Sequence, residues 1–140
     1  MSIKVDIQRA TQVAAADMPL AREFRIWVRA ALTPRRHDAD LALRVVDEEE
    51  SAYLNKTYRG KPGPTNVLSF AAEISPEVPV ALLGDLVICA PVVLREADEQ
   101  HKPAQAHWAH MTVHGCLHLL GYDHQTARAA SCSTSQADRT

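Results

Sequence analysis

An apolar stretch in the second half of the chain reads Leu82-Leu83-Gly84-Asp85-Leu86-Val87-Ile88-Cys89-Ala90. Its length and its aliphatic side chains predict a buried strand with a Gly-Asp pair inside it. Two helices are predicted after it, over residues 91–101 and 103–120, because a proline opens each of them and Gly121 stops the second.

The half of the chain before this strand alternates between strand and helix patterns. Apolar residues recur at every second position in short segments and at helical spacing in longer ones, and a Gly/Pro-rich loop precedes one further strand. The predicted elements are strands over residues 3–8, 41–45 and 66–71 and helices over 14–31 and 48–58, the second with Asp47 as its cap. The resulting order, β-α-β-α-β-β-α-α, predicts a single α+β domain in which a small mixed four-stranded sheet packs with about four helices.

The composition is that of a soluble globular domain. The chain has 140 residues, 46% of them apolar and 23% charged, which excludes a collagen, a coiled-coil rod and a wholly disordered chain. The chain has 15 Lys and Arg residues and 17 Asp and Glu residues, so no global positive field indicates a nucleic-acid partner.

The cysteines and the absence of targeting signals indicate the compartment. Three cysteines without a C-x-x-C pair favour a reducing compartment. No signal peptide or bilayer-spanning stretch is visible, so we expect a cytoplasmic protein.

The end of the chain differs from the rest. Residues 125–140 contain no Leu, Ile, Val, Met or aromatic side chain. Such a segment cannot bury enough apolar area to offset the entropy lost on ordering. We therefore expect a folded domain over residues 1–124 and a disordered polar tail over residues 125–140.

Histidines are concentrated where the chain reads His114-Gly115-Cys116-Leu117-His118-Leu119-Leu120-Gly121-Tyr122-Asp123-His124. On a helix, His114 and His118 lie one turn apart on the same face, so both imidazoles can reach one ion. Gly121 permits a sharp turn that lets His124 fold back as a third ligand. Three neutral imidazoles favour Zn²⁺ with water in the fourth position, the arrangement of a catalytic zinc site.

The same spacing also fits a polar helix face that happens to carry histidines, but the added glycine and third histidine argue against that interpretation. His110 lies one turn before His114 and is interpreted as a supporting or surface group, because it is too far from His118 to share an ion. Metzincin zinc peptidases have the spacing H-x-x-x-H-x-x-G-x-x-H, but their general-base Glu is replaced here by Gly115, which argues against proteolysis. The remaining histidines are expected at the surface: His37, His101 and His107.

Four sequence blocks together resemble the YbeY family of bacterial endoribonucleases, also called rRNA maturation factors. Together they span roughly residues 40–124. The blocks are Tyr58-Arg59 with Pro64-Thr65-Asn66-Val67-Leu68-Ser69-Phe70, Leu83-Gly84-Asp85-Leu86-Val87-Ile88-Cys89, His107-Trp108-Ala109-His110-Met111-Thr112-Val113, and the histidine motif itself.

The resemblance implies a single α+β domain with the activity of a single-strand-specific, metal-dependent endoribonuclease. Such an enzyme matures the 3′ end of 16S rRNA and acts in ribosome quality control in the cytoplasm. The resemblance implies one zinc ion per chain, held by His114, His118 and His124, and catalytic roles for Arg59, His114 and His118. The implied partners are single-stranded RNA, rRNA, and the ribosome or small-subunit proteins, with neither DNA nor a membrane expected.

Several polar residues in these blocks have two interpretations each. Arg59 suits catalysis because RNA hydrolysis places negative charge on phosphorus, and otherwise it is a solvated cation at a helix end. Asn66 and Ser69 either line a cleft or satisfy backbone groups. Asp85 must face solvent or find a partner, such as a histidine that it orients. Asp123 is interpreted as a turn or supporting residue.

Two features differ from the family pattern. Family members usually continue past the third histidine with a charged helix, and residues 125–140 show no such pattern. With a net charge of −2, affinity for RNA must come from a local basic patch. The candidates for this basic patch are Arg35, Arg36, Lys56, Arg59 and Lys61.

Two other functions stay open: a non-catalytic zinc-stabilised ribosome-assembly factor and a different metallohydrolase. The choice between water and the RNA 2′-OH as nucleophile also stays open.

Overall fold

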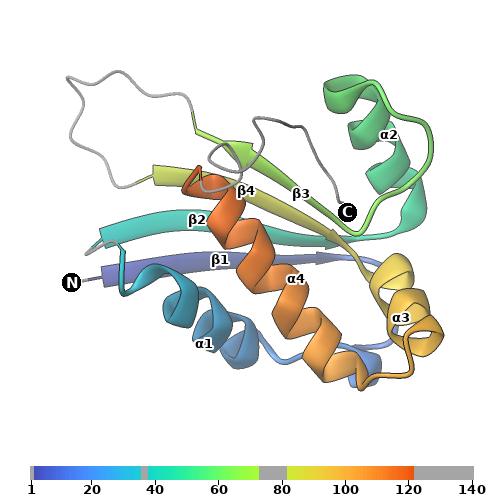
Figure 1. Ribbon diagram of the computed structural model, residues 1–140, viewed down its shortest axis with the longest axis horizontal. Helices are drawn as coiled ribbons and strands as arrows, with labels where there is room; N and C mark the ends of the chain where they lie inside the picture. The colour runs from blue at the N-terminus through green and yellow to red at the C-terminus, as the bar shows by residue number, and fades with distance from the viewer. Residues whose placement is uncertain (1, 36–37, 73–81, 122–140) are drawn as a thin grey trace.

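The computed structural model describes residues 2–35, 38–72 and 82–121. Within them the elements occur in the predicted order β-α-β-α-β-β-α-α, which confirms the α+β class (Figure 1). The tail predicted over residues 125–140 lies outside the described residues. The elements are β1 (Ser2–Ala10), α1 (Ala21–Leu32), β2 (Asp38–Val46), α2 (Glu48–Arg59), β3 (Val67–Ala71), β4 (Leu82–Cys89), α3 (Ala90–Glu99) and α4 (Ala104–Leu119), with a 3₁₀ turn at Ala15–Asp17.

The four-stranded sheet is mixed, with the strand order β1-β2-β4-β3. β1 and β4 each run parallel to β2, while β3 runs antiparallel to β4 at one edge. Parallel neighbours need a crossover connection, which α1 supplies between β1 and β2. β4 lies between β2 and β3 and is covered on both faces, which explains why its sequence is apolar almost throughout.

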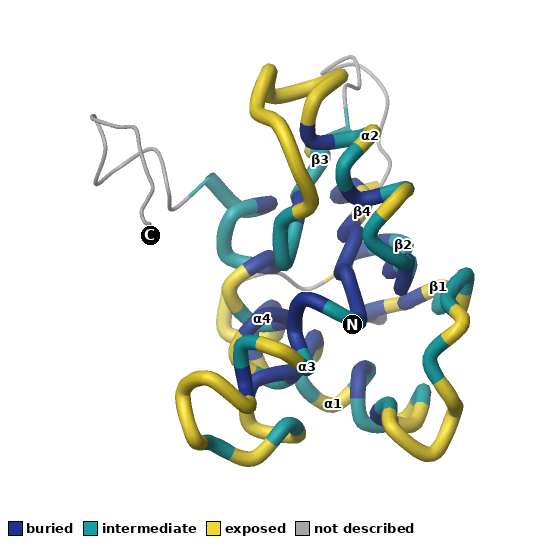
Figure 2. Tube along the Cα trace, turned by 90° about the vertical axis from the view of Figure 1, so that its right-hand side faces the viewer, coloured by how far each residue is buried: buried dark blue, intermediate teal, exposed yellow. Residues whose placement is uncertain are grey.

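Helices cover the two faces of the sheet unequally. α1 and α4 pack on one face, over a core that includes Phe24, Leu86 and Trp108. α2 packs on the opposite face, over a smaller core that includes Leu68 and Val87. Figure 2 shows α2 on one side of the strands and α1 and α4 on the other. The motif helix α4 and the helix that ends at Arg59 therefore belong to different layers.

Helix α1 begins at Ala21 rather than at residue 14, where the apolar spacing predicted its start. Proline disfavours the helical conformation in the residue that precedes it. Met18, which precedes Pro19, accordingly has an extended backbone with φ −126° and ψ 154°. The proline thus separates a short 3₁₀ turn from the helix proper, although the apolar pattern continues through both.

Asp47 occupies the N-cap position of α2 but does not cap the helix with its side chain, contrary to the prediction. Its carboxylate instead accepts hydrogen bonds from the Thr11 hydroxyl and, at 2.9 Å, from the Gln12 N–H. The carboxylate therefore ties the start of α2 to the segment that follows β1.

Gly84 allows three elements to approach one another closely. Its φ is +148°, and a Cβ there would overlap the Phe70 carbonyl oxygen and lie 2.9 Å from Leu119 Cδ2. The last turn of α4 therefore packs directly on the β3–β4 pair. This contact brings the histidine motif to the edge of the sheet that β3 forms.

Candidate functional site

Helix α4 carries one buried stripe and one stripe of histidines. His110 and His114 are exposed and His118 is half-buried. Their ring centroids lie 6.2 Å apart between His110 and His114 and 4.2 Å apart between His114 and His118. The structure thus brings together two of the predicted metal ligands, one helical turn apart. The buried stripe consists of His107, Trp108, Met111, Thr112, Gly115, Cys116 and Leu119.

His114 and His118 fit a zinc site as a pair of donors. Their rings are neighbours tilted by 50°, and imidazole is an ordinary zinc ligand. The third predicted ligand, His124, lies outside the described residues. Across residues 2–35, 38–72 and 82–121, no three His, Cys, Asp or Glu side chains are grouped so as to hold an ion. A complete site would need a further ligand from outside these ranges.

A hydrogen bond joins strand β3 to α4 at Gly115, within the histidine motif. Ser69 Oγ donates a hydrogen bond of 3.1 Å to the Gly115 carbonyl, so Ser69 satisfies a backbone group, which is one of its two predicted roles. A Cβ at Gly115 would lie 2.8 Å from Leu86 Cδ2 and 3.2 Å from Val67 Cγ2. Position 115 therefore faces the sheet, where no larger side chain fits, and not the stripe of histidines.

His107 is buried, which corrects the expectation that it lies at the surface. It is 2% exposed, and its Nε2 lies 2.8 Å from the Glu96 carboxylate on α3. Asn66 donates from Nδ2 to both oxygens of that carboxylate, at 3.1 and 3.2 Å. The sequence pattern of α4 cannot reveal this burial, because the polar partner that makes it tolerable lies on another helix. His101, by contrast, is exposed as predicted.

The surroundings of Glu96 and of His110 shift the pKa values of both groups. Burial alone would raise the pKa of the Glu96 carboxyl, but the hydrogen bonds from His107 and Asn66 outweigh it and leave that pKa below its ordinary value. Partial burial lowers the pKa of His110, and the nearby Lys102 and His107 lower it further. The His110 imidazole beside His114 is therefore neutral at neutral pH.

Arg59 is not brought next to the histidines. It is the last residue of α2, which packs on the face of the sheet opposite α4, and the edge strand β3 lies between the two layers (Figure 1). The side chain is exposed and forms no hydrogen bond or ion pair with any residue that the structure describes. A ligand that touches both Arg59 and His114 must therefore pass around the edge of the sheet.

The predicted basic patch is divided between the two layers. Lys56, Arg59 and Lys61 are exposed together at the C-terminal end of α2. Arg35 follows α1 in the other layer, and Arg36 lies outside the described residues. The part of the patch that shares one place is therefore the end of α2 with the loop that follows it.

Asp85 faces solvent, the first of its two predicted alternatives. It pairs with Phe70 on the antiparallel strand β3, and paired residues project to the same side of a sheet. The Phe70 ring packs against Tyr58 of α2, so Asp85 also lies in the α2 layer. Asp85 therefore cannot orient a histidine of α4.

Neither described cysteine is a candidate nucleophile. Cys89 and Cys116 are both buried. Burial raises the pKa of the Cys116 thiol to about 12 and also raises that of Cys89. Both thiols are protonated at neutral pH and lack the thiolate that attacks substrates or binds metals.

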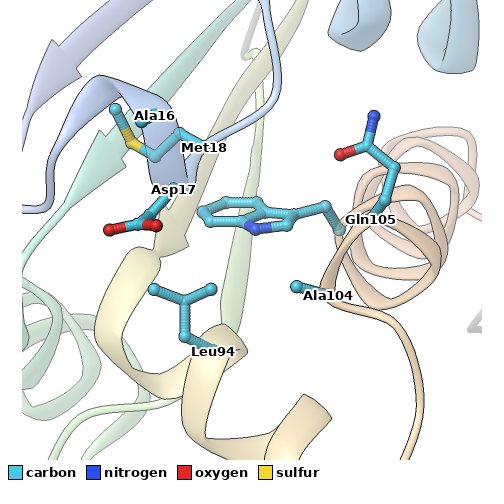
Figure 3. Close-up of a pocket in the computed structure, with 7 residues that line it drawn as sticks. Ala16, Asp17, Met18, Leu94, Ala104 and Gln105 are labelled. Atoms are coloured by element: carbon cyan, nitrogen blue, oxygen red, sulfur yellow. The ribbon is translucent and has the colours of Figure 1, made fainter.

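A cavity of about 340 Å³ lies at the other end of α4, away from the motif (Figure 3). It contains no histidine, and its lining includes both polar and apolar side chains. We assign it to the packing between the 3₁₀ turn, α3 and α4. The lining residues are Ala16, Asp17, Met18, Leu94, Ala104, Gln105 and Trp108.

Comparison with known proteins identifies a family and a similar fold. A sequence model of the family described as "Endoribonuclease YbeY" matches residues 6–139 of the chain. The fold is similar to the solution structure of TM1509 from Thermotoga maritima, with a TM-score of 0.57 and 23% sequence identity over 95% of this chain and 83% of that one. At this identity the likeness concerns the fold alone. In the part of the chain that the structure describes, no helix is long and apolar enough to cross a membrane.

Proposed function

Because the chain belongs to the YbeY endoribonuclease family, we propose that it is a zinc-dependent, single-strand-specific endoribonuclease that matures the 3′ end of 16S rRNA and acts in ribosome quality control in the cytoplasm. Family membership itself gives the coarser statement, an RNA-cleaving hydrolase with a role in rRNA processing. The proposed zinc dependence is supported by one observation, the neighbouring rings of His114 and His118 on the accessible side of α4, and the other details follow the family resemblance.

We infer that His114, His118 and His124 hold one zinc ion per chain. When bound, the ion supplies Lewis-acid stabilisation of negative charge and activates water. The chain contributes a rigid platform, because Ser69 and the close contact at Gly115 hold the motif helix against the sheet. Rigid support of this kind keeps the imidazoles in one geometry during turnover.

We assign Arg59 to the RNA phosphate. Its guanidinium is exposed and unengaged by the described residues, so its five donors are available to phosphate oxygens. Negative charge that develops on phosphorus during cleavage strengthens those hydrogen bonds, which is how a cation accelerates the reaction. The opposite placement of Arg59 and His114 implies that the RNA strand crosses the β3 edge.

The nucleophile is either water or the 2′-OH of the RNA itself. Attack by the 2′-OH leaves a 2′,3′-cyclic phosphate, whereas attack by water does not. Analysis of the product ends separates the two routes, whichever metal the chain carries.

Cleavage of an end-labelled single-stranded RNA tests the proposal. The purified chain is compared with the chelator-treated chain, with His118→Ala from the same preparation, and on a matched duplex. We expect cutting of the single strand that disappears in both controls and on the duplex. A folded chain that holds one metal ion and binds RNA but does not cut it would instead support the non-catalytic assembly factor.

A peptidase of metzincin type is disfavoured by the surroundings of Gly115. A glutamate at this position would project into Leu86 and Val67 rather than toward the histidines. The peptidase general base therefore has no place at its usual point in the motif.

A further inference from the structure

We propose that Tyr58 is a base-stacking residue for single-stranded RNA, and that Tyr58, Arg59 and Lys61 together form the surface on which the strand lies before it reaches the histidines. We call these three residues the stacking corner. This inference rests on the proposed function, because it identifies the part of the chain that recognises the substrate.

Tyr58 is a large aromatic side chain held in place at the surface. It is 66% exposed, although it lies on a helix that packs on the sheet. Its ring meets the Phe70 ring edge-to-face, with centroids 5.3 Å apart and planes at 71°. Such a contact restrains the ring at little cost in exposed area, so Tyr58 offers an oriented flat surface to solvent.

Hydrogen bonds from buried side chains of α2 hold the loop that follows Tyr58 in place. Ser51 and Asn55 are buried polar residues of α2, at 1% and 4% exposure. The Ser51 hydroxyl donates to the Thr65 carbonyl at 2.9 Å and accepts from the Thr65 N–H at 3.0 Å, while Asn55 Nδ2 donates to the Gly63 carbonyl at 2.9 Å. Lys61 therefore sits on a loop whose backbone is fixed before any ligand arrives.

Charge is separated along α2. Two of the three acidic residues in its first turn form ion pairs with arginines, with Glu50 2.7 Å from Arg44 and Glu48 3.0 Å from Arg95. The cations at its last turn, Lys56 and Arg59, form no ion pair within the described part of the chain. The end that carries Tyr58 is thus an uncompensated positive surface, which suits a phosphate backbone.

The stacking corner is joined to the motif helix through one strand. On β3, Phe70 contacts Tyr58 on one face of the sheet, and its neighbour Ser69 contacts Gly115 of α4 on the other. β3 is an edge strand, and no further strand among the described residues lies beyond it. A flexible single strand can therefore run from Tyr58 over the edge to His114.

The chemistry selects single-stranded RNA as the occupant. Proteins that bind single strands combine cations that follow the backbone with aromatic rings on which bases stack. A base can stack on Tyr58 only when it has left its own helix, whereas the bases of a duplex are already stacked and paired. Tyr58 would therefore contribute to the preference for single strands.

Asp85 marks one limit of this surface. It is exposed and pairs in register with Phe70, on the same face of the sheet as Tyr58. Its carboxylate repels phosphate, so the backbone is expected to run on the side of Tyr58 that carries Arg59 and Lys61.

Fluorescence anisotropy with a labelled single-stranded RNA tests the inference apart from cleavage, with 2′-O-methyl groups to block attack by the 2′-OH and a chelator to block attack by metal-activated water. We expect Tyr58→Leu to weaken binding about five- to tenfold, the low end of the range for one stacked base. Tyr58→Phe and Tyr58→Trp, which keep a flat ring, should stay within about twofold of the unaltered chain. Tyr53→Leu is the matched control, because Tyr53 is 67% exposed on the same helix and has no aromatic neighbour among the described residues.

A second measurement links Tyr58 to a base. Abasic sites are placed one at a time along the RNA, and one position should cost the unaltered chain several-fold in affinity but cost Tyr58→Leu nothing. The inference is overturned if Tyr58→Leu binds like the unaltered chain, if Tyr53→Leu loses as much, or if the abasic penalty persists in Tyr58→Leu. If the chain binds RNA with these properties but does not cut it, the proposed function fails while the stacking corner stands.

Discussion

His107 Nε2 lies 2.8 Å from the Glu96 carboxylate, and this contact joins α3 to the buried side of the helix that carries the histidine motif. Asn66 completes the network by donating to both oxygens of the same carboxylate just before β3 begins. The residue before β3 and the two helices α3 and α4 thus share one half-buried carboxylate. The motif helix is held on this side by electrostatics and, at Gly115, by close packing.

Glu96→Gln should weaken the dependence of stability on acid pH. The folded-state pKa of Glu96 lies below its ordinary value of 4.5, so its contribution to stability is present above that pH and is lost as the pH falls through the folded pKa. Unfolding free energy measured by denaturant between about pH 6 and pH 3 should therefore fall less steeply in Glu96→Gln. Glu99→Gln, an exposed carboxylate of the same helix, should leave the slope unchanged; equal slopes in all three proteins would contradict the prediction.

His118→Ala should remove the metal, whereas His110→Ala should retain it. Both histidines lie on the same stripe of α4, but only His118 has its ring within 4.2 Å of His114. Metal content after dialysis, measured by plasma mass spectrometry, should fall from about one ion per chain to nearly none in His118→Ala, since losing one of three ligands weakens a zinc site severely. Retention of a full equivalent by His118→Ala would show that the ion binds elsewhere.

Arg59→Ala should lower kcat about 100-fold or more without lowering the melting temperature, because the side chain is exposed and makes no contact that folding needs. Arg59→Lys should recover only part of the loss, because an ammonium cannot contact two phosphate oxygens in the planar geometry of a guanidinium. Lys56→Ala, one turn earlier, provides the control and should change KM by less than about threefold with kcat intact. Comparable losses of kcat in both alanine variants would argue for a diffuse field instead of a specific contact.

Gly84→Ala should destabilise the fold far more than Gly60→Ala. Both glycines have positive φ, at +148° and +69°, but a Cβ at Gly60 meets nothing within 4 Å. We expect Gly60→Ala to cost about 1 kcal/mol and Gly84→Ala more than about 3 kcal/mol, since the second adds a backbone clash to the strain. Thermal unfolding of the two variants measures the difference, and similar melting temperatures would be incompatible with the close approach of β3 and α4.

Most of the fold could be predicted from local pattern. The order of eight elements and the mixed sheet follow from the switch between period-two and helical spacing, together with prolines and glycines at the breaks. Two predictions of the fold are wrong because they rest on local pattern alone. The apolar spacing before residue 32 predicts a helix that continues through Pro19, which the extended backbone at Met18 excludes. The position of Asp47 predicts a partner within its own helix, but its hydrogen-bond partners follow β1.

The candidate site could be predicted only in part. The pairing of His114 with His118 follows from the geometry of any helix, so spacing alone was enough. The burial of His107 was missed because its partner Glu96 lies eleven residues away on another helix, and no periodicity relates the two. The participation of His124 stays a prediction.

The sequence by itself determined the elements, their order and the two adjacent imidazoles, because each depends on residues within a few positions of one another. Only the tertiary structure decided that Asp85 points away from the histidines, that Ser69 supports the Gly115 carbonyl, and that Arg59 lies in the opposite layer. These relationships depend on which face of the sheet each helix covers. That choice is made by the burial of apolar surface over the whole chain, which no short stretch of residues encodes.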